Sequence, residues 1–313
     1  GLFRFGALIR YIPYTITTGF TAGIAVTIAI GQVKDFLGLT FTTSPVETLD
    51  KLKAIIGSFK TVNPWAVLIG AVALAILILL AKFLPKIPAS LIAVLVCAAA
   101  VKLLKLDVNT IGALYPDITS APPKFTMPDF SLESIVSLIP NAVTIAVLAG
   151  VESLLSCVVA DGMIGTKHNS NMELVAQGIG NIGSAFFGGI PATGAIARTA
   201  ANIKNGGRTP IAGMVHAVVL LLVLVLFMPY AKLIPMPAIA AILFVVAYNM
   251  SEWREFKSIV CTAPKSDILV LVLTFLLTVI FDLVVAIAVG LAVHYAIKLI
   301  KHMSQNKKYE KNS

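Results

Sequence analysis

Charged residues are scarce in this sequence. Asp, Glu, Lys and Arg make up 12% of the 313 residues, whereas a water-soluble globular chain carries about 25%. Hydrophobic residues make up 58%. Such a chain cannot present a charged surface to water over most of its length. The composition therefore excludes an ordinary soluble domain and indicates a membrane protein.

Cysteine and histidine are also rare, and their placement excludes several kinds of site. Cys97, Cys157 and Cys261 are isolated from one another, so they predict neither a disulfide framework nor a zinc site. His216 and His294 have no partners at ligand spacing. No nucleophile is paired with a recognisable base in the sequence. We therefore predict no metal site, no cofactor and no enzyme activity.

A glycine-rich stretch, Gly178-Ile179-Gly180-Asn181-Ile182-Gly183, matches the dinucleotide fingerprint G-x-G-x-x-G by letter. No strand is predicted before it, and no acidic residue follows about 20 positions later. We interpret the glycines as sites of close contact between helices in lipid.

Apolar segments of spanning length recur along the chain. A spanning helix needs about 20 mostly apolar residues, because the hydrocarbon core is about 30 Å thick. The predicted spans are Thr15–Val33, Pro64–Phe83, Pro88–Leu104, Leu132–Val159, Asn171–Phe187, Pro210–Met228, Pro237–Met250, Asp267–Phe281 and Leu283–Ile300. A further helix, Ala195–Lys204, is too short to span alone. The expected fold class is an all-α polytopic membrane protein.

The net charge of +9 has a topological explanation. If the C-terminal tail is cytoplasmic, most Lys and Arg residues fall on the inner side of the membrane, as the positive-inside rule requires. We therefore expect a multi-pass protein of the cell membrane with a cytoplasmic C-terminus. Nucleic acid is not an expected partner.

Three segments interrupt the apolar pattern. Ser44–Phe59 and Ser251–Lys265 have amphipathic helical stripes and are expected to lie along the membrane interfaces. Asp107–Asp129 contains four prolines and is expected to be an external loop. Ser170 followed by Glu173 fits the S-x-x-E capping box at the start of a helix.

The run from Gly188 to Thr199 carries the strongest functional signal. Its glycines and proline predict an extended piece over Phe187–Thr193, followed by a half-helix that begins near the middle of the membrane. The free N–H groups of a half-helix and the positive end of its dipole suit an anion, and Arg198 adds a full positive charge. The candidate substrate-binding residues are Thr193, Gly194, Ala195, Ile196, Ala197 and Arg198. The alternative is a structural kink in which Arg198 pairs with a carboxylate.

Glu152 is an acidic residue inside a predicted span, where ionisation is expensive. With Ser156 one helical turn away, it is the candidate coupling-ion site, carrying a proton or helping to bind a small cation. The alternatives are a permanent ion pair with Arg198 or a hydrogen-bonded acid that holds helices together. On the next span, Gln177 and Asn181, with Ser184, form a polar stripe for which interhelical hydrogen bonding is the favoured interpretation.

Residues 9–39, 150–203 and 207–224 resemble the SulP family of anion transporters, the sulfate permeases, and the string GIPATGAIARTAANI is especially specific. The resemblance covers nearly the whole chain. It implies fourteen segments in two inverted repeats, with a core unit that moves against a gate unit. The chain would match segments five to fourteen. The first four segments and the cytoplasmic STAS domain would be absent, so we expect a fragment whose anion pocket has only one wall.

By the same resemblance, residues 1–105 would be gate helices of the first repeat and residues 106–230 core helices of the second. Residues 231–303 would be gate helices of the second repeat, and residues 304–313 a cytoplasmic tail. Proton-coupled members resemble this chain in having glutamate at the position of Glu152. Sodium-coupled bicarbonate members tend to carry aspartate there, with threonine four residues on.

The resulting hypothesis is a secondary active transporter that moves a small anion with a proton by elevator-like alternating access. Sulfate, bicarbonate and a dicarboxylate such as fumarate are the candidate substrates. The expected partners are the anion, the coupling proton, the lipid bilayer and a second copy of the chain in a homodimer. Sodium is the less favoured coupling ion. The alternatives are an anion exchanger, a channel-like protein and a sodium-coupled bicarbonate transporter.

Overall fold

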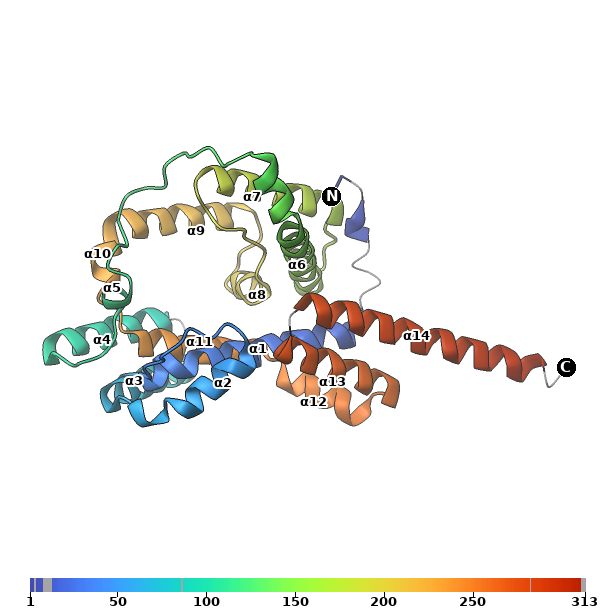
Figure 1. The fold of residues 1–313 in the computed structure, drawn as a ribbon, viewed down its shortest axis with the longest axis horizontal. Helices are drawn as coiled ribbons and strands as arrows, with labels where there is room; N and C mark the ends of the chain where they lie inside the picture. Colours follow the sequence, from blue (N-terminus) through green and yellow to red (C-terminus); the bar gives the residue numbers. More distant parts are fainter. Residues whose placement is uncertain (3, 8–12, 86, 282, 311–313) are drawn as a thin grey trace. The chain divides into compact units, whose positions relative to one another are not determined.

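The protein is built from α-helices (Figure 1). The computed structural model describes residues 1–2, 4–7, 13–85, 87–281 and 283–310. Of residues 197, 283, 284, 301, 302 and 304–310 it describes the backbone alone. Within this part of the chain there is no β-strand, only an isolated bridge between Thr110 and Pro235. The helices divide into two compact units, one of Gly1–Pro13 and Ala121–Val225, the other of Tyr14–Ser120 and Leu226–Ser313.

The first unit contains the longest helix that the structure describes. Its helices are α6 (Leu132–Ile164), α7 (Ser170–Phe186), α8 (Ile196–Lys204) and α9 (Ile211–Leu222). Both α7 and α8 pack against α6.

The second unit contains α1 (Tyr14–Leu37), α2 (Thr48–Gly57), α3 (Pro64–Phe83), α4 (Ala89–Leu104), α5 (Ile111–Leu114), α10 (Met228–Ala231), α11 (Met236–Met250), α12 (Trp253–Thr262), α13 (Lys265–Ile280) and α14 (Leu283–Glu310). Its centre is α1, which packs against both α11 and α13. Small and branched side chains of α3, α4 and α11 form a buried core, with Ala73, Ala93, Cys97, Ala238 and Ala241 all inaccessible to solvent.

All the predicted spans are helical in the structure, but Pro210–Met228 contains a π-helical turn and α14 continues to Glu310, beyond the predicted end at Ile300. Among the described residues, five helical stretches are long and apolar enough to cross a membrane, namely Tyr14–Leu37, Pro64–Phe83, Leu132–Ile164, Ile211–Ala231 and Met236–Thr262. Ala89–Leu104 and Val285–Ile300 are shorter apolar helices. The two remaining predicted spans correspond to α7 and α13, which have 17 and 16 residues. The all-α membrane fold is confirmed.

The interrupting segments also take the predicted local structure. Helix α2 forms within the first amphipathic segment and α12 within the second. The proline-rich stretch holds only the short helix α5. That α2 and α12 lie along the membrane interfaces stays a prediction.

The helix α6 is defined at both ends by local signals. Ser131 caps its start by accepting a hydrogen bond from the Ser134 N–H, and Gly165 ends it in the left-handed conformation with φ of 79°. Hydrogen bonds from the Ser134 hydroxyl, and from the Ser131 N–H and hydroxyl, hold the pKa of the Asp129 carboxyl below its usual range. Pro140 lies inside the helix without ending it.

Helix α9 continues into an irregular last turn. The π-helical turn Val223–Phe227 separates it from α10, where Pro229 follows at the second position. Proline has no N–H and its ring crowds the carbonyl four residues back, which explains the break in regular helix. The predicted span Pro210–Met228 is therefore not one regular α-helix.

Two glycines of α1 allow close contact with α13. A Cβ on Gly19 would lie 2.6 Å from the Leu271 carbonyl oxygen, and one on Gly23 would lie 2.6 Å from Thr278 Cβ. Gly19 and Gly23 are spaced as in the G-x-x-x-G packing motif of membrane helices. Their role depends on α13, more than 200 residues further along the chain.

Gly19→Ala is expected to lower the thermal unfolding temperature of the protein in detergent. The added methyl cannot fit against the Leu271 carbonyl without moving α1 from α13, and overpacking of this kind costs about 1–3 kcal/mol. Gly31→Ala is the matched control on the same helix, because a Cβ there meets no atom within 4 Å. The control should leave the unfolding temperature unchanged or raise it. An equal response of the two variants would contradict the close contact.

Candidate functional site

The helical path is broken between α7 and α8 (Figure 1). Phe187 and Gly188 form a turn, with φ of 67° at Gly188, and residues 189–195 have no regular structure before α8 begins at Ile196. Ala195 is extended, with φ of −115° and ψ of 115°. The predicted short helix is confirmed. The expected extension over Phe187–Thr193 is wrong at its first two residues, because the chain first reverses there through a left-handed glycine.

The polar stripe of α7 holds the nonhelical segment. Asn181 Oδ1 accepts a hydrogen bond from the Ala192 N–H at 2.7 Å. The amides of Asn181 and Gln177 donate to the Ala192 carbonyl oxygen at 2.9 and 2.8 Å, and the Ser184 hydroxyl donates to the Ile190 carbonyl oxygen at 3.2 Å. The stripe therefore serves backbone rather than the side chains of another helix. Nonhelical backbone in a membrane needs such partners.

The other side of the segment lies against α6. The Thr193 hydroxyl donates to the Ala149 carbonyl oxygen at 2.7 Å. A Cβ on Gly194 would lie 3.3 Å from Ser153 Oγ and 3.5 Å from Ser156 Cβ. Only a residue without a side chain leaves this approach to α6 unhindered. Thr193 and Gly194 thus fix where α8 begins, besides being candidate substrate contacts.

Arg198 is the third residue of α8 and is exposed. In the described part of the chain, no carboxylate lies within 4.0 Å of its guanidinium, so the alternative of an ion pair with Glu152 is not observed. Glu152 is partly buried on α6, and the charge of Arg198 acts on it electrostatically. The two groups are near neighbours without direct contact. The charge of Arg198 remains available to a ligand.

Ser156 is engaged at the contact between α6 and α8. It is 4% exposed, and its hydroxyl donates to Thr199 Oγ1 at 2.8 Å. Thr199 follows Arg198 directly and lies just outside the six candidate substrate residues. The sequence predicts this contact only if the side of α8 that carries Thr199 is known to face Ser156 of α6.

The six candidate substrate residues therefore form one continuous stretch at the start of α8. Thr193, Gly194 and Ala195 precede the helix, Ile196 opens it, Ala197 is described by its backbone alone, and Arg198 completes the first turn. Ala195 provides no side-chain cap. The first N–H groups of a helix have no partner within it. These N–H groups and Arg198 belong to the same turn of α8, and amides and a guanidinium both suit an anion.

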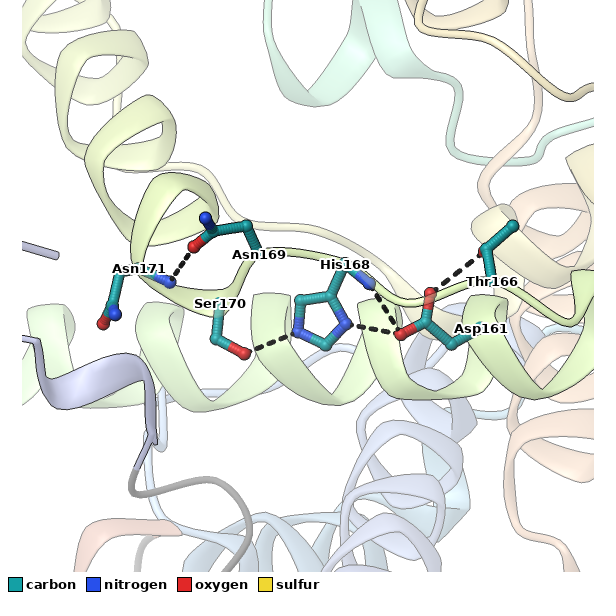
Figure 2. Close-up of polar contacts among 6 residues, drawn as sticks. All are labelled: Asp161, Thr166, His168, Asn169, Ser170 and Asn171. Atoms are coloured by element: carbon teal, nitrogen blue, oxygen red, sulfur yellow. Dashed lines mark hydrogen bonds and ion pairs between the residues drawn. The ribbon is translucent and has the colours of Figure 1, made fainter.

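The connector between α6 and α7 contains a hydrogen-bonded cluster that the sequence did not reveal (Figure 2). His168 Nδ1 lies 2.7 Å from Asp161 Oδ2, and its Nε2 lies 2.9 Å from Ser170 Oγ. The backbone N–H of His168 also donates to Asp161 Oδ2 at 2.9 Å, and the Thr166 hydroxyl donates to Asp161 Oδ1 at 3.2 Å. The cluster joins the end of α6 to the start of α7.

The predicted capping box at the start of α7 is wrong. Asn169 is the cap, and its Oδ1 accepts from the Asn171 N–H at 3.2 Å (Figure 2). It also accepts from the Met172 N–H at 3.2 Å. Ser170 is the first helical residue, and its hydroxyl faces His168. Asparagine satisfies the free amides of a helix start as well as serine does, and it lies one residue earlier.

Ser170, His168 and Asp161 have the order of contacts found in hydrolytic triads. Such chemistry also needs N–H donors for an oxyanion. Here the N–H groups that follow Ser170 already donate to Asn169. We interpret the cluster as a structural tie between two helices. Among the described residues, no group of three His, Cys, Asp or Glu side chains is placed to hold a metal ion.

The chain is similar in sequence to several known proteins. The model of the Sulfate permease family matches residues 1–274. The putative sulfate transporter YvdB of Bacillus subtilis is 44% identical over 278 residues, which is 88% of this chain and 52% of that protein. The bicarbonate transporter BicA of Synechocystis is 31% identical, with 88% and 49% covered. The chain thus spans about half the length of these relatives.

The fold is also similar to that of a solved transporter structure. The transmembrane domain of a cyanobacterial bicarbonate transporter, BicA, superposes with a TM-score of 0.72 and 29% sequence identity. The match covers 94% of this chain and 71% of that one.

Proposed function

The chain belongs to the sulfate permease family, and from this premise we propose that it carries a small anion across the cell membrane by secondary active transport. The observation that supports this most directly is the start of α8. An exposed arginine without an ion pair in the described structure lies in the first turn of a helix that begins after a break. Helix amides and a guanidinium together recognise carboxylate, sulfate or bicarbonate oxygens.

We propose that Thr193, Gly194, Ala195, Ile196, Ala197 and Arg198 contact the anion. Relatives named as sulfate and bicarbonate transporters make these two anions the first substrates to examine, and a dicarboxylate such as fumarate is the third. Sodium-coupled transport of bicarbonate is the second candidate function, and the relatives named as bicarbonate transporters support bicarbonate as its substrate.

The coupling ion in this proposal is a proton, carried by Glu152 beside Ser156. An acidic group inside the membrane is costly to keep charged, so it takes up and releases a proton as its surroundings change. The nearby positive charge of Arg198 favours the ionised form, and a bound anion offsets that charge. Anion binding and protonation of Glu152 are then thermodynamically linked.

The larger movement in this proposal is elevator-like. Gate helices over residues 1–105 and 231–303 would support a core over residues 106–230 that carries the site. The active form would be a homodimer with a cytoplasmic C-terminus.

Flux measurements in proteoliposomes test the proposed function. Radiolabelled sulfate, bicarbonate and fumarate are supplied outside, with and without an inward proton gradient, and with sodium as the alternative driving ion. We expect saturable uptake of at least one anion, accelerated by the proton gradient. Uptake that rises linearly with concentration would indicate a channel. Uptake that follows sodium and ignores the proton gradient would select the bicarbonate alternative.

A further inference from the structure

Two carboxamide side chains of α7 converge on the backbone of one residue, Ala192. Asn181 pairs with both of its polar groups: Oδ1 accepts from the Ala192 N–H at 2.7 Å, and Nδ2 donates to the Ala192 carbonyl oxygen at 2.9 Å. Gln177, one turn earlier on α7, donates to the same oxygen at 2.8 Å. A carbonyl oxygen has two lone pairs, so α7 uses both. Ala192 therefore has no polar backbone group left for a substrate.

The carbonyl group of Ala192 sets the direction of the next N–H along the chain. A peptide group is planar, and in its trans form the carbonyl and the N–H point in opposite directions. The described part of the chain has no cis peptide bond, so the Ala192 carbonyl and the Thr193 N–H are opposed in this way. Because the carbonyl points to α7, the Thr193 N–H points away from α7.

The Thr193 N–H is the first backbone donor of the candidate site that is available to an anion. Among the described residues it has no hydrogen-bond acceptor, and Thr193 is only partly buried. An N–H group inside a membrane is costly to leave unsatisfied, so water or a ligand is its expected partner. Thr193 lies three residues before Ile196, where α8 begins. Its N–H therefore belongs to the same short stretch as the free amides of the helix start.

We propose that Asn181 and Gln177 are positioning residues of the anion site, which act through the Ala192 carbonyl and turn the Thr193 N–H toward the bound anion. This inference rests on the proposed anion site at the start of α8. While both carboxamides hold Ala192, the N–H is oriented before the anion arrives. Without them, part of the binding free energy is spent on ordering the segment. Anion affinity should therefore depend on two side chains that do not touch the anion, whereas flux at saturation should not.

Ser184 provides a comparison on the same polar stripe of α7. Its hydroxyl donates to the Ile190 carbonyl oxygen at 3.2 Å, so it also holds the nonhelical segment. The peptide group that begins with this carbonyl ends on the nitrogen of Pro191, which carries no hydrogen. The Ser184 contact thus holds backbone without orienting a donor. Its removal separates loss of orientation from simple loosening of the segment.

Equilibrium binding of radiolabelled sulfate, bicarbonate and fumarate to the purified protein in detergent tests the proposal. Asn181→Leu keeps the approximate size of the side chain but removes both bonds to Ala192, and it should weaken binding about tenfold. Gln177→Met removes one bond and should weaken binding about threefold, as expected for a single neutral hydrogen bond. Ser184→Ala is the matched control and should bind as the unmodified protein does. In proteoliposomes the half-saturation concentration should rise by the same factors, with maximal flux retained.

Nuclear magnetic resonance of protein with isotope-labelled threonine observes the donor itself. The Thr193 amide signal, assigned by its loss from Thr193→Ser, should move downfield when the anion is added to the unmodified protein or to Ser184→Ala. At the same anion concentration it should move less in Asn181→Leu and Gln177→Met. If Asn181→Leu does not fold, Gln177→Met decides alone, because it leaves the Asn181 bonds in place.

Three results would overturn the inference while leaving the anion site intact. They are an anion that binds without moving the Thr193 signal, unchanged binding in the folded carboxamide variants, and equal weakening by Ser184→Ala and Asn181→Leu. If the unmodified protein binds none of the three anions, the proposed function itself is contradicted, and the positioning role falls with it.

Discussion

Arg198→Ala is expected to raise the half-saturation concentration for the transported anion about ten- to a hundredfold, or to abolish transport. A charge-assisted hydrogen bond contributes about 1.5–3 kcal/mol, which corresponds to that range. The guanidinium has no ion pair within 4.0 Å among the described residues, so its removal leaves no carboxylate unpaired. Saturation kinetics of radiolabelled uptake in proteoliposomes measure the effect. Arg198→Lys should restore it only in part, since lysine keeps the charge but loses the planar fork.

Lys204→Ala is the matched control for this prediction. Lys204 is an exposed cation on the same helix, but it lies in the last turn, at the opposite end from the candidate site. Its removal should leave the half-saturation concentration unchanged. Unchanged kinetics in a folded Arg198→Ala protein would assign Arg198 a structural role and leave the helix amides as the anion contacts.

Glu152→Gln is expected to abolish the acceleration of uptake by an inward proton gradient while retaining anion exchange. Glutamine keeps the size and hydrogen-bonding capacity of the side chain but cannot titrate. For one coupled proton, each pH unit supplies about 1.4 kcal/mol, or about tenfold accumulation of anion. The variant should lose that accumulation. Uptake against an anion gradient, measured at several imposed pH differences, gives the result.

Glu133→Gln is the corresponding control, because Glu133 lies in the first turn of the same helix and is exposed. It should accumulate anion as the unmodified protein does. If Glu152→Gln also still concentrates the anion with the same pH dependence, the coupling proton is carried elsewhere.

Local signals in the sequence predicted the helices well. The spans follow from runs of apolar residues long enough to cross a bilayer, and Pro64–Phe83 was predicted with the ends it has in the structure. The break before α8 follows from the backbone freedom of glycine and the missing N–H of proline, which act within a few residues. The capping box failed because two caps one residue apart compete, and the sequence does not show that Asn169 reaches the free amides first.

The sequence by itself thus determined the membrane class, the spans, the short helix and the two residues, Glu152 and Arg198, whose charges are unusual in such surroundings. Only the tertiary structure decided the partners. In the structure, Asn181 forms hydrogen bonds with the backbone of Ala192, Ser156 with Thr199, and Glu173 with Ser153. Each of these contacts depends on how a helix is rotated about its axis and which neighbour it meets. These contacts join residues that are 11 to 43 positions apart in the chain. No local sequence pattern therefore predicts the rotation of each helix.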